Sequence, residues 1–283
     1  MENILRLKER KLAKILKNMG SILVAFSGGV DSSFLLAFSR RVLGNKNVLG
    51  VTTISEVESE DEIREAKKIG EKLNVKHIIY KYSALENPEF VKNPPNRCYF
   101  CKTDIYKSLL KIAEENNIKW VADGSHSDDI RDGRPGLKAL KEMNIRSPLA
   151  EAGLKKEEIR KLSKKMNLPT WNKPANPCLS SRIPFGTPIT EEAISRIDKG
   201  ERFLKSLGYK VFRLRDHFPI ARIEIEKKEF QKILKKPGLS KKIVDFMKSL
   251  GYTYITLDLE GYRSGSLEET LNKNLSLHSS EQK

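Results

Sequence analysis

Short apolar segments alternate with segments of helical periodicity through the first part of the 283-residue sequence. Apolar runs of this kind are typical of strands that are buried in a parallel sheet. They predict a βαβαβαβ order, and hence an α/β fold with a doubly wound parallel sheet and a ligand at the carboxyl ends of its strands. The predicted strands are 21–26, 47–54, 77–82 and 120–123, and the predicted helices are 31–43, 59–74, 103–117 and 155–167.

A smaller α+β module is predicted after the Pro-rich segment "LPTWNKPANPCLSSRIPFGTP" at 168–188, which we interpret as a functional connector. The strands of this module alternate apolar and polar residues. We divide the chain into a first domain at 1–172, a second domain at 173–263 and a flexible polar tail at 264–283. In the module, the predicted helices are 190–208 and 241–251, and the predicted strands are 210–217, 220–226 and 252–259.

The formal net charge is +16, from 53 Lys and Arg residues against 37 Asp and Glu residues. Most lysines are mixed with glutamates along amphipathic segments such as 62–74, which is typical of a solvated helix surface and of proteins from hot environments. The charge is therefore compatible with RNA or with an anionic small molecule and decides neither. Residues 1–20 predict an amphipathic helix and not a signal peptide, and no apolar run is long enough to span a membrane. We expect a cytoplasmic protein without a membrane partner.

The segment "SGGVDSS" at 27–33 joins the first predicted strand directly to a helix. Its glycines permit positive φ and let backbone N–H groups approach an anion at the helix N-terminus. The lysine of a Walker loop is missing, so cleavage between the α and β phosphates, with pyrophosphate held by the loop, is the favoured chemistry. Asp31 is then predicted to hold Mg²⁺. The alternative is an ordinary glycine-rich turn.

This loop resembles the signature of the PP-loop (HUP-like) ATP pyrophosphatases, which adenylate a carboxyl or carbonyl oxygen and let a nucleophile displace AMP. The segment "ADGSHSDD" at 122–129 resembles a later strand-end element of that family, although it could be a plain Asp/Ser-rich loop. The resemblance implies that residues 1–172 form the PP-loop domain. It also implies that ATP is bound by Ser27, Gly28, Gly29, Val30, Asp31, Ser32, Ser33, Gly124 and Asp128 or Asp129.

The sequence contains three cysteines, of which Cys98 and Cys101 form a C-x-x-C pair and Cys178 lies far away. Both sulfurs of such a pair can reach one metal. Three thiolates could hold three irons of a [4Fe–4S] cluster and leave the fourth iron open to sulfide or to a substrate oxygen, as sulfur insertion requires. Two alternatives stay open: zinc held by the three cysteines and a distant histidine, and a buried or incidental cysteine pair.

Longer blocks closely resemble the LarE family, pyridinium-3,5-biscarboxylic acid mononucleotide sulfurtransferases that make the organic part of the nickel-pincer cofactor of lactate racemase. The resemblance covers about residues 20–263. Some members have only the cysteine of the "CLSSR" motif and sacrifice its sulfur, leaving dehydroalanine. Others carry three cysteines and resemble cluster-bearing, catalytic versions, and this chain is similar to that second group. The blocks are 93–102, 132–140, 146–162, 168–190 and 213–225.

Arg213 and Arg215 alternate along a predicted strand, so both should point to one face. With Arg182 and Arg263 they could bind a phosphate and carboxylates bidentately, while Glu201 and Glu224 orient the arginines or the pyridinium ring. A surface ion pair is the alternative for any single arginine. The resemblance implies that the second domain binds the substrate through Arg182, Glu201, Arg213, Arg215, Glu224 and Arg263, and that the catalytic residues are Cys178, Asp31, Ser181 and Arg182.

We therefore expect an ATP-dependent, AMP-forming sulfurtransferase. A substrate carboxylate would attack the α-phosphorus, giving acyl-adenylate and pyrophosphate, and a sulfur species would then displace AMP. The expected partners are the pyridinium mononucleotide, sulfide or another sulfur donor, and further copies of the chain, with a hexamer as the family precedent. Nucleic acid is not an expected partner. The rival hypotheses are a tRNA thiolase with a three-cysteine cluster and a non-enzymatic nucleotide-binding subunit.

Overall fold

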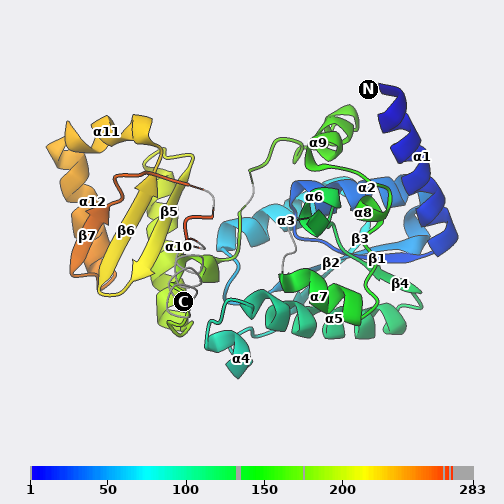
Figure 1. Ribbon diagram of the computed structural model, residues 1–283, viewed down its shortest axis with the longest axis horizontal. Coiled ribbons are helices and arrows are strands. Elements are labelled where there is room, and N and C mark those ends of the chain that lie inside the picture. Colours follow the sequence, from blue (N-terminus) through cyan, green and yellow to red (C-terminus); the bar gives the residue numbers. More distant parts are fainter. Residues whose placement is uncertain (1, 132–134, 175, 264, 268, 270–283) are drawn as a thin grey trace, which may run out of the picture. The chain divides into compact units, whose positions relative to one another are not determined.

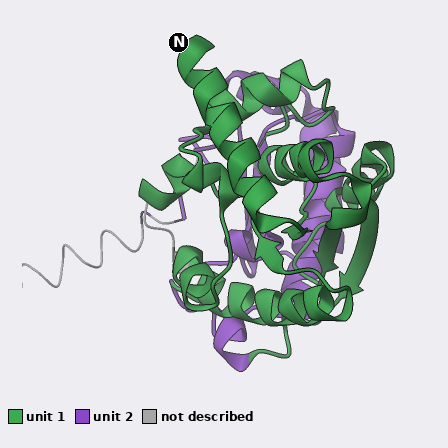
Figure 2. Ribbon diagram, turned by 90° about the vertical axis from the view of Figure 1, so that its right-hand side faces the viewer, with its two compact units in different colours: residues 1–87, 96–176 green, residues 88–95, 177–283 purple. Residues whose placement is uncertain are grey.

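The computed structural model (Figure 1) describes residues 2–131, 135–174, 176–263, 265–267 and 269. The chain divides into two compact units (Figure 2): unit 1 comprises residues 1–87 and 96–176, and unit 2 comprises residues 88–95 and 177–283. The sequence interpretation did not anticipate that the segment 88–95 belongs with unit 2. Most of the tail predicted at 264–283 lies outside the described residues.

Unit 1 contains a four-stranded parallel sheet in the order β3-β2-β1-β4, which confirms the predicted α/β fold. The central strand β1 pairs through Ile22 with Val48 of β2 on one side and with Trp120 of β4 on the other. The order reverses between β1 and β4, which is where open α/β sheets bind ligands. The strands are β1 (Ile22–Ala25), β2 (Val48–Ile54), β3 (Lys76–Lys81) and β4 (Trp120–Ala122).

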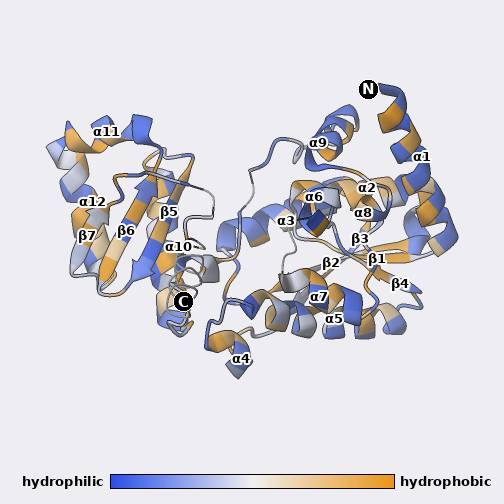
Figure 3. Cartoon of the chain, in the orientation of Figure 1, coloured by the Kyte–Doolittle hydropathy of each residue, from blue (hydrophilic) through white to orange (hydrophobic). Residues whose placement is uncertain are grey.

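Both faces of this sheet are covered by helices. Ile22 and Val24 of β1 point into a core that includes Leu12, Leu16 and Phe34. The alternate residue of β1 points to the opposite face, into a second core formed with α5 and α7. The helices carry both apolar and polar residues, as expected for amphipathic layers (Figure 3). They are α1 (Glu2–Met19), α2 (Val30–Leu43), α3 (Glu60–Leu73), α5 (Arg97–Glu115), α6 (Ser127–Arg131), α7 (Pro135–Glu142), α8 (Pro148–Glu151) and α9 (Lys156–Lys165), with a 3₁₀ turn η1 (Asn45–Asn47).

Local sequence signals explain where α3 begins and ends. The Ser59 side chain accepts a hydrogen bond from the Glu62 backbone N–H at 3.3 Å, and acidic residues occupy the first turn, where they favour the helix dipole. Asn74 ends the helix in the left-handed conformation, with φ of 48°. The helix therefore begins at Glu60, a short loop after the carboxyl end of β2 at Ile54. No helix among the described residues is long and apolar enough to cross a membrane.

Unit 2 is a small α+β fold around a three-stranded sheet in the order β5-β6-β7. Strands β5 and β6 are antiparallel, whereas β6 and β7 are parallel. Leu204, Leu214, Ile223 and Met247 form its core with helices α10 and α12. Its elements are α4 (Pro88–Val91), η2 (Leu179–Arg182), α10 (Glu191–Ser206), β5 (Phe212–His217), β6 (Ile220–Ile225), η3 (Lys227–Glu229), α11 (Phe230–Leu234), α12 (Pro237–Ser249) and β7 (Tyr254–Leu257).

The segment 88–95 joins unit 2 through Asn93, whose side chain is fully buried. The Asn93 Nδ2 donates hydrogen bonds to the carbonyls of Pro184 at 2.8 Å and of Thr187 at 2.9 Å. The backbone N–H of Gly186 donates to the Asn93 carbonyl at 2.9 Å. These bonds satisfy polar groups that burial would otherwise leave unpaired.

Gly200 of α10 lies so close to β5 that a methyl group cannot be added without movement. A Cβ at this position would lie 2.2 Å from Leu214 Cδ2 and 3.3 Å from Met247 Sδ. Overpacking of this kind costs about 1–3 kcal/mol, so Gly200→Ala should lower the free energy of unfolding by that amount. Gly238→Ala is the matched control, because a Cβ on Gly238 of α12 meets nothing within 4 Å. Thermal unfolding followed by circular dichroism should show a lower midpoint for the Gly200 variant only; equal midpoints would contradict this packing.

Candidate active site

The loop at 27–33 of unit 1 forms the tight turn that its glycines predict. The Phe26 N–H still donates to the Val51 carbonyl at 2.8 Å, and α2 begins at Val30. Gly28 has φ of +69°, and a Cβ there would lie 2.9 Å from Ala66 Cα of α3. Both its backbone conformation and its surroundings therefore require glycine.

The serines of the loop hydrogen-bond to one another and fix its shape. The Ser27 N–H donates to Ser32 Oγ at 3.2 Å, and the Gly29 N–H donates to Ser27 Oγ at 3.3 Å. Ser33 Oγ is buried and has no hydrogen-bond partner among the described residues. Because the first N–H groups of a helix lack partners within the helix, this turn and the amino end of α2 can bind an anion.

The end of β4 reaches the same loop. A Cβ on Gly124 would lie 2.9 Å from Ser32 N and 3.2 Å from Asp31 Cβ, so these two segments are in close contact. Asp128 follows on α6, and its Oδ2 accepts the Lys156 backbone N–H at 2.9 Å. That hydrogen bond is the main cause that lowers the pKa of Asp128. Asp129 Oδ2 accepts the backbone N–H of His126 at 3.1 Å.

Two lysines that the sequence interpretation missed lie against this loop. Lys156 Nζ is 2.5 Å from Asp31 Oδ2. Asp31 Oδ1 is buried and has no partner among the described residues, so it is available to a cation. Lys173, in the Pro-rich connector, donates from Nζ to the Gly28 carbonyl at 3.3 Å and to Glu62 Oε2 at 3.1 Å. The first part of the connector thus folds back over the loop within unit 1.

The C-x-x-C pair lies in the first turn of α5, also in unit 1. Cys98 is exposed and Cys101 is half-buried, with its Sγ 3.6 Å from the Tyr82 hydroxyl. Burial, and then the nearby Cys101, raise the pKa of Tyr82 far above its usual range, so its hydroxyl stays protonated. Among the residues that the structure describes, no group of three or more His, Cys, Asp or Glu side chains could hold a metal ion. The predicted cluster is therefore not confirmed.

The "CLSSR" motif forms the 3₁₀ turn η2 at the start of unit 2. The Cys178 carbonyl accepts the backbone N–H of Ser181 at 3.0 Å and its hydroxyl at 2.8 Å. Arg182 is fully buried; its Nη1 donates to the Cys178 carbonyl at 2.9 Å, and its Nε and Nη2 donate to both oxygens of Glu201 at 2.9 Å. Arg182 thus attaches the turn that contains Cys178 to helix α10, which contains Glu201.

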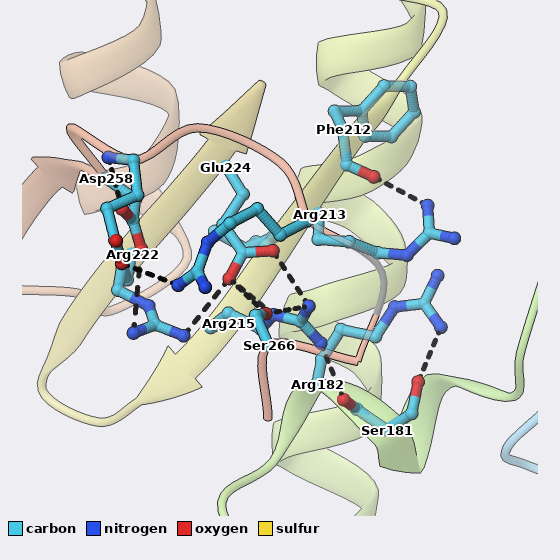
Figure 4. Close-up of polar contacts among 12 residues, drawn as sticks. Ser181, Arg182, Phe212, Arg213, Arg215, Arg222, Glu224, Asp258 and Ser266 are labelled. Carbon is cyan, nitrogen blue, oxygen red and sulfur yellow. Dashed lines mark hydrogen bonds and ion pairs between the residues drawn. The ribbon is translucent and has the colours of Figure 1, made fainter. Parts of the chain in front are cut away.

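A second buried pair lies on the strands (Figure 4). Arg215 Nε and Nη2 donate to the two Glu224 oxygens at 3.0 and 2.8 Å, and Arg215 Nη1 donates to the Ser181 carbonyl at 2.8 Å. Arg222, which we did not predict as a site residue, donates to Glu224 Oε1 at 3.1 Å. The sequence feature that could have identified Arg222 is its spacing of two residues from Glu224 on β6, which places both side chains on one face of the strand.

Arg213 is the arginine of this group whose surroundings most favour an anion. Its guanidinium lies over the Tyr262 ring at 5.2 Å and donates to the Phe212 carbonyl at 2.6 Å. Figure 4 shows it next to the guanidinium of Arg182. Burial lowers the pKa of Arg213, and repulsion by the neighbouring Arg182 charge lowers it further. An anion would relieve that repulsion.

Arg263 has different partners from the other predicted arginines. Its guanidinium pairs with Glu260 at 2.6 Å and with Glu269, and these acids raise its pKa. Arg263 therefore forms surface ion pairs, which was the alternative interpretation of each predicted arginine.

Comparisons with known proteins find relatives that cover most of the chain. A model of the NAD synthase family matches residues 5–91, which include the loop at 27–33. An uncharacterized protein of Synechocystis is 38% identical over 268 residues, 94% of this chain and 99% of that protein. The pyridinium-3,5-bisthiocarboxylic acid mononucleotide synthase of Lactiplantibacillus plantarum is 37% identical over 268 residues, 94% of this chain and 95% of the synthase. A tRNA-specific 2-thiouridylase of Leptospira biflexa is 26% identical, over 56% of this chain and 52% of its own.

The match to the synthase extends over nearly the full length of both proteins and includes the loop of unit 1 as well as the arginine-rich sheet of unit 2. This chain therefore belongs to the family of that synthase, the LarE family of PP-loop proteins.

Proposed function

We propose that this chain is an ATP-dependent sulfurtransferase, which adenylates a carboxylate of pyridinium-3,5-biscarboxylic acid mononucleotide and converts it into a thiocarboxylate for the nickel-pincer cofactor. The observation that carries the proposal is the match to the Lactiplantibacillus synthase over 94% of this chain. The partial match to the thiouridylase, over 56% of the chain, gives weaker support to a tRNA substrate. On the family precedent alone, we also propose a homo-oligomer.

The direct test combines the purified protein with ATP, Mg²⁺, sulfide and the biscarboxylic acid mononucleotide. Mass spectrometry should then detect the thiocarboxylate together with AMP and pyrophosphate. RNA that copurifies with the protein and becomes thiolated in place of the mononucleotide would support the tRNA thiolase. ATP binding without pyrophosphate release would support a non-enzymatic subunit.

Unit 1 would carry out the adenylation. Backbone N–H groups of the loop 27–33 would bind phosphate oxygens, while Gly124 allows β4 to approach closely. The substrate carboxylate attacks the α-phosphorus, the bond from the α-phosphorus to the bridging oxygen breaks, and pyrophosphate leaves. The buried Asp31 Oδ1 fits an oxygen ligand for Mg²⁺, which when bound would neutralise phosphate charge.

Unit 2 would bind the anionic mononucleotide. Arg213 is the proposed contact to a phosphate or a carboxylate, because burial and then the neighbouring Arg182 charge lower the pKa of Arg213 and an anion would offset both effects. Arg182 and Arg215 are each bound bidentately to a glutamate, so we assign them the role of holding the Cys178 turn in place. Glu201 and Glu224 act through these two arginines. Arg263 would have to leave its acidic partners to reach a substrate.

The three cysteines are proposed to deliver sulfur through a [4Fe–4S] cluster. The positions of Cys98 and Cys101 within one helical turn let both sulfurs face one metal. A cluster bound by three thiolates would supply an iron that can hold sulfide. The competing proposal is that Cys178 donates its own sulfur.

Asp31→Asn removes the proposed metal ligand while it keeps the size of the side chain. We expect pyrophosphate release to fall roughly tenfold to a hundredfold, because a charge-assisted contact worth about 1.5–3 kcal/mol is lost. Circular dichroism should be unchanged. Asp245→Asn is the matched control, since the exposed Asp245 pairs with the exposed Lys241 on the surface of α12. Normal release by the Asp31 variant would remove this residue from the site.

Arg213→Ala should weaken mononucleotide binding roughly tenfold to a hundredfold and leave ATP binding unchanged, because its proposed partner is a substrate anion. Isothermal titration with each ligand measures the two effects separately. Arg263→Ala is the comparison, and we expect a smaller loss because Arg263 already pairs with acids. Equal losses for ATP and for the mononucleotide would show that Arg213 has a structural role.

Protein purified without oxygen should contain about four irons per chain if the three cysteines hold one cluster. Changing any one of Cys98, Cys101 and Cys178 to Ala should then remove the iron and stop repeated turnover. The sacrificial alternative has different consequences. One sulfur per chain would be transferred, intact-mass analysis would show a loss equal to H₂S at Cys178, and Cys98→Ala would have little effect.

A further inference from the structure

A pocket lined by basic side chains lies in unit 1, where helices α1 and α9 both pack against α2 (Figure 1). Its volume is about 570 Å³, which is within the range of sites that bind small molecules. Helix α2 begins at Val30 beside the loop at 27–33, and Arg41 of the pocket lies near its other end. The rise of a helix separates these two residues by roughly 16 Å, so the basic pocket is distinct from the proposed nucleotide site.

The charge of the basic pocket is strongly unbalanced. Glu9 is its one acidic lining residue, so an excess of four positive charges remains. Among the described residues, Arg10 and Lys17 make no hydrogen bond or ion pair with the rest of the chain. Both are exposed, so their charged groups can reach a ligand. The five basic residues that line the pocket are Arg6, Arg10, Lys17, Arg41 and Lys165.

Two of the basic groups are held in position before any ligand binds. Arg41 Nη2 donates to Glu9 Oε1 at 2.7 Å, and the Arg41 guanidinium lies over the Phe38 ring at 4.5 Å. Lys165 Nζ lies 3.8 Å from the other oxygen of Glu9. The Arg41 side chain remains 49% exposed, and an ion pair with that much solvent contributes little to stability. Glu9 therefore serves mainly to orient these two cations at the pocket.

The hollow shape of the pocket depends on Ala13. Arg6, Arg10, Ala13 and Lys17 follow a spacing that places them on one face of α1. Long basic side chains therefore surround a single methyl group, which leaves space at the centre of this face. A solvated helix surface of the kind predicted for most lysines would instead place acids beside them, and Arg6 alone of these basic residues pairs with an acid of its own helix, Glu2.

We propose that the basic pocket binds a small ligand that carries several phosphate charges. Guanidinium and ammonium groups bind phosphate oxygens through charge-assisted hydrogen bonds. The cations come from three helices and converge on one hollow, which suits a compact polyphosphate. The backbone of a nucleic acid would instead require basic groups along an extended groove. The pocket is thus a second anion site, independent of the adenylation chemistry proposed for unit 1.

The test compares the double variant Arg10→Gln/Lys17→Gln with the control Lys107→Gln/Lys111→Gln, which changes two exposed lysines of α5 and removes the same charge. Isothermal titration with inorganic tripolyphosphate in the absence of Mg²⁺ measures binding to each protein. We expect the affinity of one site per chain to fall roughly tenfold to a hundredfold in the pocket variant, because two charge-assisted contacts are lost. The control should match the wild type.

A further variant, Ala13→Phe, fills the hollow without removing charge, and it should weaken the same site. If Ala13→Phe does not fold, Ala13→Met undergoes the same titration. Equal affinities of the pocket variant and its control would overturn the inference. Unchanged binding by the Ala13 variant would do so as well, because diffuse positive charge would then be sufficient. Tighter binding of a single-stranded oligouridylate than of tripolyphosphate, lost when Arg10 and Lys17 are changed, would assign the pocket to nucleic acid and also overturn it.

Discussion

The meeting of four parallel strand ends at one edge of the sheet determines how unit 1 can work. Each strand of such a sheet must be followed by a turn at that edge, so residues distant in sequence are forced together. The turn after β1 carries the loop at 27–33, and the turn after β4 approaches it so closely that Gly124 has no room for a Cβ. Tyr82, just past β3, reaches Cys101 at the same edge.

Unit 2 is organised by buried ion pairs instead. Arg182 and Glu224 are fully buried, and each is satisfied by a bidentate partner. Removing one member of such a pair leaves an uncompensated charge, which typically costs about 3–5 kcal/mol. The pairs are thus poorly suited to change partners during turnover. This is why we separate Arg182 and Arg215, which hold the Cys178 turn, from Arg213, whose positive charge is disfavoured by burial and by the neighbouring Arg182 charge.

Patterns within short segments of the sequence predicted the parallel sheet of unit 1 and the loop at 27–33. The apolar periodicity gave the parallel sheet, and the two glycines placed directly after a strand gave the loop. Lys156 could not be predicted in this way, because 125 positions separate it from Asp31 and a lysine on an amphipathic helix usually faces solvent. Arg263 shows the opposite problem: the family resemblance that assigned it to the substrate site carried no information about its ion pairs with Glu260 and Glu269. The attachment of 88–95 to unit 2 depends on the buried Asn93, which no local pattern distinguishes.

The groups proposed to bind the anions of the reaction are backbone N–H groups in unit 1 and an arginine in unit 2. The nature of these groups determines how binding depends on pH. Backbone N–H groups do not titrate, and an arginine whose pKa is lowered, such as Arg213, still keeps its charge near neutrality. Asp128, whose pKa is lowered, is likewise ionised there. Arg213 and Asp128 therefore hold their protonation state across the neutral range. The phosphates of the ligands do titrate close to that range, because the second pKa of a phosphate monoester lies at about 6.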